Sequence, residues 1–188
     1  MSGTKTVGTA ERNELLGHGG PREILARIVT GDPLEIRHRT ARRARERALL
    51  VDVERASLRA FALVAARGTR YRGRPRLELW LDARVDDALD EWLEEERAAS
   101  CAHAPGAPSR RGGAQGGELA RRLGLSPRRL AAGRARFHEL GFDDRDAFLR
   151  LVIEVAPLDA TANALGVTVT ELARRARRAL QAFLVEVA

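Results

Sequence analysis

The sequence predicts an all-α protein made of two small helical domains joined by a flexible linker. Apolar residues recur at the i, i+3, i+4 spacing of amphipathic helices along most of the chain, and strict strand-like alternation is not found. Residues 98–117 are rich in alanine, glycine and proline without periodicity, which is typical of a linker. The predicted organisation is a mobile N-terminus at 1–20, a helical domain at 21–97, the linker at 98–117 and a second helical domain at 118–188.

Four helices are expected in the first domain. The first begins near Pro21, a residue that suits the first turn of a helix, and residues 31–33 (Gly-Asp-Pro) end it. A strongly basic helix follows over residues 36–50. Its arginines fit a solvated surface equally well as contact with nucleic acid or an acidic protein, because a run of charge alone does not choose a partner. The third helix, residues 52–67, has a clear apolar face, and the fourth covers residues 76–97.

The fourth helix is apolar on one side and acidic on the other. Trp80 and Trp92 fall on the apolar stripe, so we interpret them as core residues rather than as platforms for base stacking. The acidic face consists of Asp82, Asp86, Asp87, Asp90, Glu91, Glu94, Glu95 and Glu96. Acidic helix faces are usually solvated, so a metal site is not expected here.

The second domain contains a weak internal repeat. Two sets of residues match at a constant offset of 42: Ala120, Leu123, Gly124, Leu125, Ser126 and Leu130 against Ala162, Leu165, Gly166, Val167, Thr168 and Leu172. The first copy is either a second DNA-binding motif or a structural corner between helices, and the corner is favoured because such corners are common. Between the copies, a helix at 143–155 carries Asp143 and Asp144 at its start, where carboxylates complement the helix dipole.

The C-terminal stretch, residues 158–188, predicts a helix, a tight turn and a longer basic helix. Gly166 suits the left-handed conformation that ends many helices, and Thr168 and Glu171 have the spacing of a capping box. An apolar stripe in the second helix leaves four arginines mainly off the core side: Arg174, Arg175, Arg177 and Arg178. This is the helix-turn-helix pattern, in which the second helix enters the major groove and arginines bind phosphates or guanine. The alternative is an ordinary amphipathic helix with a solvated basic face.

The composition indicates an anionic partner and a cytoplasmic location. The chain of 188 residues has a formal net charge of +7 and a pI near 11.0, which favours a polyanionic partner. Its single cysteine, Cys101, excludes an internal disulfide framework and fits a cytoplasmic protein. The sequence lacks the run of about 18 apolar residues that a membrane span requires, and its N-terminus is too polar for a secretory signal.

We do not expect an enzyme. The four histidines, His18, His38, His103 and His138, are scattered, and the Cys101-Ala-His103 pair has no second metal-like pair to complete a zinc site. Neither a phosphate-binding glycine loop nor a nucleophile motif is present. The sequence therefore predicts no metal and no cofactor.

Three stretches, in this order, resemble a small bacterial sigma factor of the extracytoplasmic-function type. Residues 52–61 (DVERASLRAF) look like the helix by which that family docks on core RNA polymerase. Residues 71–81 (YRGRPRLELWL) and the helix after them look like the signature that leads into the promoter-opening helix. Residues 144–180 are similar to the family's C-terminal helix-turn-helix, with Leu-Gly-Val at 165–167.

The resemblance implies a sigma factor that binds core RNA polymerase and promoter DNA, and it allows for an anti-sigma protein as a further partner. It implies polymerase contacts at Asp52, Glu54 and Phe61. It implies a promoter-opening role for Trp80, Arg84, Asp87 and Glu91. It implies that the upstream promoter element is read by Thr170, Arg174, Arg175, Arg177 and Arg178.

The chain departs from the family pattern in two helices. In the docking helix Leu58 replaces a glutamine and Arg55 an acidic residue, and in the promoter-opening helix Asp87 and Glu91 replace an asparagine and an aspartate. Three glutamates at residues 94–96 stand where arginines are usual, and such a face would repel DNA phosphates. The alternative function is therefore a DNA-binding regulator without sigma activity, whose acidic helix contacts a basic protein or a second copy.

Overall fold

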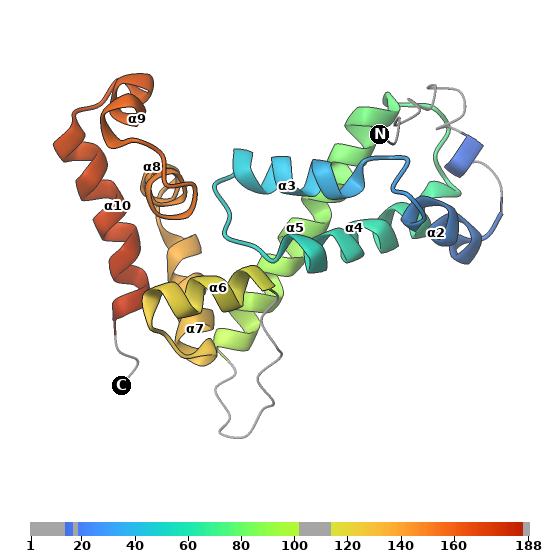
Figure 1. Cartoon of the computed structure of the whole chain (residues 1–188). Helices are drawn as coiled ribbons and strands as arrows, with labels where there is room; N and C mark the ends of the chain where they lie inside the picture. Colours follow the sequence, from blue (N-terminus) through green and yellow to red (C-terminus); the bar gives the residue numbers. More distant parts are fainter. Residues whose placement is uncertain (1–13, 17–18, 102–113, 186–188) are drawn as a thin grey trace, which may run out of the picture. The chain divides into compact units, whose positions relative to one another are not determined.

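The computed structural model describes residues 14–16, 19–101 and 114–185, and over these ranges it contains helices and no strand, as the sequence predicts (Figure 1). The helices are α2 (Pro21–Val29), α3 (Ile36–Glu46), α4 (Val53–Gly68), α5 (Leu77–Cys101), α6 (Ala114–Leu123), α7 (Pro127–Glu139), α8 (Phe142–Phe148), the π-helical turn η1 (Leu149–Ile153), α9 (Leu158–Leu165) and α10 (Val169–Leu184). The basic helix α3 is shorter than expected, because it ends at Glu46 rather than near residue 50.

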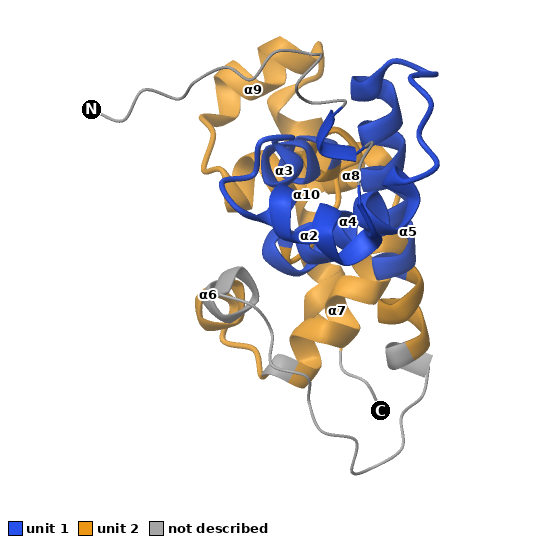
Figure 2. Cartoon of the chain, turned by 90° about the vertical axis from the view of Figure 1, so that its right-hand side faces the viewer, with its two compact units in different colours: residues 1–43, 53–93 blue, residues 44–52, 94–188 orange. Residues whose placement is uncertain are grey.

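The chain forms two compact units, which Figure 2 shows in different colours. Unit 1 comprises residues 1–43 and 53–93, and unit 2 comprises residues 44–52 and 94–188. The predicted division near residue 97 lies close to the second boundary. Residues 44–52, which we call the strap, comprise the last three residues of α3 and the connection to α4, and they belong to unit 2. Periodicity gave no sign of this.

Both segments predicted to be flexible are only partly described. Of the predicted linker, residues 102–113 lie outside the described residues, while α5 extends to Cys101 and α6 begins at Ala114, so both of its ends are helical. Of the predicted N-terminus, residues 1–13 and 17–18 lie outside the described residues. Leu16, which lies in the segment predicted to be mobile, is fully buried.

The core of unit 1 is formed by the apolar faces of α2, α4 and α5. Ile24 and Ile28 of α2 are completely buried, as are Phe61 and Val64 of α4. Burying a side chain of this size contributes about 1.5–3 kcal/mol. At the end of α4, Gly68 packs closely against Leu16, because a Cβ at this position would lie 3.1 Å from the Leu16 side chain.

The core of unit 2 is built around three phenylalanines, one each from α7, α8 and α10. The rings of Phe137, Phe148 and Phe183 contact one another with centroid distances of 5.2–5.6 Å, and all three are fully buried. Gly133 allows α7 to approach α10 closely, since a Cβ there would lie 2.5 Å from the Phe183 ring. α10 is therefore held against α7 and α8 along its apolar side.

The strap supplies core and polar contacts to unit 2. Ala48 is completely buried in the same apolar cluster as the three phenylalanines. Arg45 binds two carboxylates, with its Nη1 2.6 Å from Oδ1 of Asp146 and a second ion pair to Glu154. Burial alone would raise the pKa of Asp146, but hydrogen bonds from Arg150 and Arg45 hold it below its ordinary value. The strap is thus a structural part of unit 2.

Candidate nucleic-acid interface

The turn between α9 and α10 has the geometry that its sequence predicts. Gly166 is left-handed, with φ 65°, and the amide of Val167 donates to the carbonyl of Ala162 across 3.1 Å. Oγ1 of Thr168 accepts a hydrogen bond from the amide of Glu171 at 3.1 Å, which caps α10. The other half of the predicted capping box is replaced, because the Glu171 carboxylate binds arginines of α10 instead.

One narrow stripe of α10 is exposed and polar. The helix buries the opposite side through Leu172, Ala176, Ala179 and Phe183. Four exposed polar residues follow one another at intervals of four, three and four positions, so they share a face: Thr170, Arg174, Arg177 and Gln181. The exposed Arg178 borders this face. Of the five residues expected to contact DNA, three lie on this face, which we call the α10 stripe. Gln181 is a fourth member that the sequence reasoning missed, although its spacing from Arg174 and Arg177 would have found it.

The two arginines in the middle of the α10 stripe differ in their contacts. Arg174 forms an ion pair with Glu171, and its side chain is still 66% exposed. Arg177 is exposed and makes no hydrogen bond or ion pair with a described residue. The Glu171 carboxylate accepts hydrogen bonds from Arg175 and Arg174, which lower its pKa. Glu171 therefore stays ionised and tempers the positive charge at the start of α10.

The remaining two arginines of α10 point to α8 rather than to the α10 stripe. Arg175 lies between two carboxylates, with its Nη1 2.9 Å from Oδ2 of Asp143 and its Nε 2.9 Å from Oε1 of Glu171. Arg178 binds Asp144 in a two-pronged arrangement, through Nη2–Oδ1 at 2.6 Å and Nε–Oδ2 at 3.1 Å. These contacts raise the pKa of both guanidinium groups. The structure thus separates the four arginines into two pairs with different surroundings.

The corner between α6 and α7 reproduces the backbone of the corner between α9 and α10. Gly124 is left-handed with φ 62°, and the amide of Leu125 donates to the carbonyl of Ala120 at 2.9 Å. Oγ of Ser126 accepts from the amide of Arg129 at 3.3 Å. Each of these contacts has its counterpart 42 residues later in the chain.

The matching faces of α7 and α10 nevertheless differ. The residues of α7 that correspond to the α10 stripe are Arg128, Ala132, Ala135 and Glu139. Ala132 and Ala135 are buried, and Glu139 is acidic. A continuous polar face with several cations is therefore missing from α7. This favours the interpretation of the first corner as structural.

The expected promoter-opening residues form a chain of contacts in unit 1, except for Glu91. The rings of Trp80 and Tyr71 lie 5.0 Å apart, and the Arg84 guanidinium lies 5.8 Å from the Trp80 ring. Arg84 also pairs with Asp87 at 3.2 Å. Trp80 is only half-buried, so its interpretation as a core residue is wrong in part, whereas Trp92 is buried as expected. Glu91 is exposed and pairs with no described residue.

Three carboxylates on the acidic face of α5, Asp82, Asp86 and Asp87, pair with arginines of unit 1. Asp82 receives Arg39 at 2.8 Å and Arg42 at 2.9 Å, both from α3. Arg43 pairs with Asp86 through its Nε at 3.1 Å and through a second, shorter contact. Three arginines of the basic run of α3 therefore bind carboxylates of the same unit.

The three residues expected to contact polymerase do not share a surface. Phe61 is fully buried, with the Arg37 guanidinium 5.5 Å from its ring, and Asp52 is a buried residue of the strap. Only Glu54 is exposed, at 77% of its side chain. One turn further along α4, Leu58 is 59% exposed, whereas Phe61 and Val64 of the same helix are buried.

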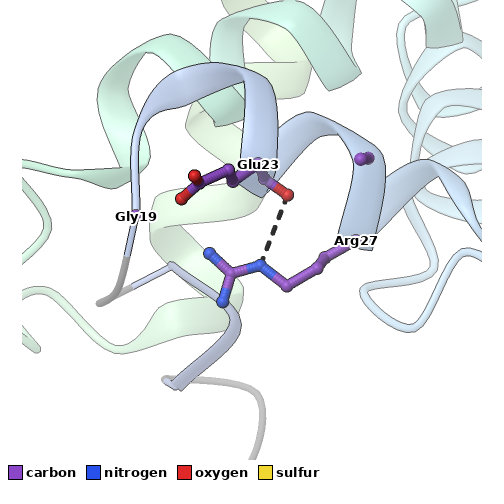
Figure 3. Close-up of a pocket in the computed structure, with 4 residues that line it drawn as sticks. Gly19, Glu23 and Arg27 are labelled. Atoms are coloured by element: carbon purple, nitrogen blue, oxygen red, sulfur yellow. Dashed lines mark hydrogen bonds between the residues drawn. The ribbon is translucent and has the colours of Figure 1, made fainter.

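Other candidate sites are weak. Figure 3 shows a shallow pocket at the start of α2, lined by Gly19, Glu23, Ala26 and Arg27. Its polar groups are already engaged, since Oε2 of Glu23 accepts from the amide of Gly20 and the Glu23 carbonyl accepts from Arg27. Within the described ranges, histidine, cysteine and carboxylate side chains form no cluster that could hold a metal ion. Among the described helices, none combines the length and the hydropathy of a membrane span.

Comparison with family models, with curated proteins and with solved structures finds no match to this chain.

Proposed function

We propose that the chain is a divergent sigma factor that binds promoter DNA through α10 and core RNA polymerase through unit 1. The observation that carries the DNA-binding part is the α10 stripe, which presents Thr170, Arg174, Arg177 and Gln181 on one exposed face after a capped turn. The sigma assignment itself is supported by the order of the three matching stretches in the sequence. A helix-turn-helix role for α9 and α10 is part of this proposal.

The α10 stripe suits the major groove in size and chemistry. The groove admits a single α-helix, and residues on one helix face recur about every 5.4 Å along the axis. Arg174 and Arg177 supply cations for phosphates or for the O6 and N7 atoms of guanine. Thr170 and Gln181 supply neutral hydrogen-bonding groups at the two ends. Affinity from the arginines should fall steeply as salt is added, because each phosphate contact releases counterions.

Unit 1 offers an exposed edge of α4 for the polymerase contact. Glu54 and Leu58 lie four residues apart and therefore on one face of the helix, and both are exposed. A large apolar side chain beside a carboxylate is a suitable anchor for a protein partner, since interface cores are rich in apolar contacts. This proposal places the contact at Glu54 and Leu58, whereas the buried Phe61 acts by holding α4 in shape.

Reconstituted transcription tests the proposal. Purified chain, core RNA polymerase and a genomic fragment library should give discrete RNA start sites that are absent without the chain. The double variant Arg174→Ala/Arg177→Ala should lose these starts and keep polymerase binding, whereas Arg128→Ala, at the matching corner, should keep both. Point variants are better than deletion of α10, which would remove Leu172, Ala179 and Phe183 from the core of unit 2. Discrete starts with the double variant would contradict the assignment to the α10 stripe.

The polymerase contact needs its own comparison. Leu58→Glu should weaken binding to core polymerase by about tenfold or more, since one buried charge without a partner costs over 1.4 kcal/mol. Leu79→Glu is the matched control, because Leu79 of α5 is 61% exposed and carries no assigned role. Equal binding by the two variants would show that Leu58 is not at the interface.

The second candidate is a DNA-binding regulator without sigma activity. The observation that favours it is the acidic character of α5. Asp82, Asp86 and Asp87 form ion pairs with arginines of unit 1, so these arginines are not available as cations for DNA. Such a helix offers little attraction to a separated DNA strand. A pull-down with core polymerase separates the two functions, since a regulator of this kind binds DNA in the absence of a polymerase complex.

A further inference from the structure

Two arginines of α10 are bound by carboxylates at the start of α8. Arg178 places both prongs of its guanidinium on Asp144, with contacts of 2.6 and 3.1 Å. Arg175 is shared between Asp143 and Glu171, each at 2.9 Å. A guanidinium recognises a phosphate or a guanine edge with the same planar fork that it uses for a carboxylate. The Nε and Nη2 edge of Arg178 is therefore occupied by Asp144, and this edge is not available to a nucleic acid at the same time.

The position of the two carboxylates is fixed by the fold. Asp143 and Asp144 lie in the first turn of α8, where the helix dipole favours negative charge. α8 packs against α10 through Phe148 and Phe183, whose rings are 5.4 Å apart. Of the two, Asp144 is the more enclosed, with 17% of its side chain exposed against 65% for Asp143. Asp144 is thus a fixed acceptor, whereas Arg178 itself is 43% exposed and lies beside the α10 stripe.

The exposure of Arg178 makes exchange of partners feasible. Ion pairs near solvent contribute little net stability, so a DNA phosphate of similar geometry can compete with the Asp144 carboxylate. In the structure Arg178 is paired with Asp144. The preceding residue, Arg177, belongs to the α10 stripe and pairs with no described residue. Arg177 can therefore contact DNA directly, whereas Arg178 must first leave Asp144.

We infer that Asp143 and Asp144 are internal competitors of DNA phosphate, which withhold Arg175 and Arg178 from the nucleic acid and so limit the affinity of α10. The inference rests on the proposed DNA-binding function of α10. The α10 stripe then carries the contacts that form first, and the two α8 carboxylates determine how many further cations join them. Neutralising Asp144 releases Arg178 and adds one phosphate contact.

The test is a double-mutant cycle on DNA affinity. Binding to a fluorescent 30-base-pair duplex is measured by anisotropy over a series of salt concentrations for the wild type, Asp144→Asn, Arg178→Ala and the double variant. Asp144→Asn should raise affinity by about three- to tenfold and steepen the slope of log Kobs against log[salt] by about 0.9, the value for one more phosphate contact. Arg178→Ala alone should change affinity by less than about twofold, and in its background Asp144→Asn should have no effect.

The controls separate this mechanism from a general effect of charge. Glu139→Gln removes one exposed carboxylate from α7 and should change affinity far less than Asp144→Asn does. Asp143→Asn should give a smaller gain than Asp144→Asn, because Glu171 still holds Arg175, and far-ultraviolet circular dichroism checks that each variant is folded. An equal gain from Asp144→Asn with and without Arg178, or no gain at all, overturns the competition while leaving DNA binding by α10 intact. Absence of binding in every variant overturns the function proposed for α10 and the competition with it.

Discussion

Nε2 of His138 accepts a hydrogen bond from the backbone amide of Leu50 across 3.1 Å, which joins α7 to the strap within unit 2. An imidazole can accept at this nitrogen only when it is neutral. Burial first, and then the positive charges of Arg145, Arg134 and Arg97, lower the pKa of His138 from 6.5 to about 3. Burial, the three arginines and the hydrogen bond from Leu50 therefore all oppose protonation of His138.

The first prediction is a loss of stability in mild acid. Above pH 6.5 neither state of His138 binds the proton. Between pH 6.5 and about 3 the unfolded chain binds it and the folded protein does not. The free energy of unfolding should then fall by up to about 1.4 kcal/mol per pH unit as the pH is lowered. Urea unfolding from pH 7.5 to 4.5 measures this slope above the range in which carboxylates such as Asp146 begin to bind protons.

The variant His138→Gln should flatten this slope, because its amide oxygen can accept from Leu50 without a titrating group. His38→Gln, which removes an exposed histidine of α3, is the control and should keep the wild-type slope. A wild-type stability that is constant between pH 6.5 and 4.5 would show that His138 is not shielded in solution.

The second prediction concerns the ion pairs of the strap. Arg45→Ala removes two carboxylate contacts and leaves the buried Asp146 with Arg150 alone, so it should lower the free energy of unfolding by about 1–3 kcal/mol. Arg42→Ala is the control from the same helix, and since Arg39 remains on Asp82 it should cost less than about 1 kcal/mol. Urea unfolding measures both, and equal losses would contradict a special role for the strap.

The third prediction tests the close approach of α7 and α10. Alanine in place of glycine normally stabilises a helix interior by about 1 kcal/mol. Gly133→Ala should instead destabilise the protein by about 1–3 kcal/mol, because the new Cβ would lie 2.5 Å from the Phe183 ring and 3.0 Å from its backbone. The Tm by circular dichroism should fall accordingly. Gly141→Ala, where the added Cβ meets open space, should shift stability by less than about 1 kcal/mol. A rise in Tm for Gly133→Ala would mean that the two helices are less tightly packed.

The fourth prediction concerns the acidic face of α5. Asp82→Asn would leave Arg39, whose side chain is 9% exposed, without its carboxylate, and should cost about 2 kcal/mol. Glu91→Gln lies on the same helix, pairs with no described residue and should be nearly neutral. The hydrogen bonds from Arg39 and Arg42 outweigh burial and lower the pKa of Asp82, so this contribution is present above the ordinary carboxyl pKa of 3.8 and is lost as the pH falls below it. Similar unfolding curves for both variants would indicate that α5 has a solvated acidic face after all.

The sequence was most informative where structure is determined locally. The turn at Gly166 and the cap at Thr168 depend on residues a few positions apart, and both were predicted correctly. The repeat 42 residues earlier gave the second turn at Gly124 for the same reason. Phe61 is instructive in the other direction, because the family resemblance suggested a surface contact, whereas its side chain is fully buried in the core of unit 1.

Contacts between distant segments could not be predicted from the sequence. Asp143 and Asp144 were interpreted through the helix dipole alone, because nothing local shows that Arg175 and Arg178 of a later helix bind them. Most of the strap was predicted as the end of the basic helix at residues 36–50, and nothing local indicated that it belongs to the core of unit 2. The arginines of α3 and the acids of α5 were both noticed, and only the fold shows that they are partners.

The strap also makes unit 2 discontinuous in the chain. A fragment that begins at residue 94 would contain α6 to α10 and still lack Ala48, the Arg45 partner of Asp146 and the Leu50 amide that faces His138. Such a fragment should unfold with low cooperativity, and a synthetic peptide of residues 44–52 added in excess should restore part of its stability. The C-terminal half is therefore not a transferable module, and exchanging it between proteins would require the strap to be carried along with it.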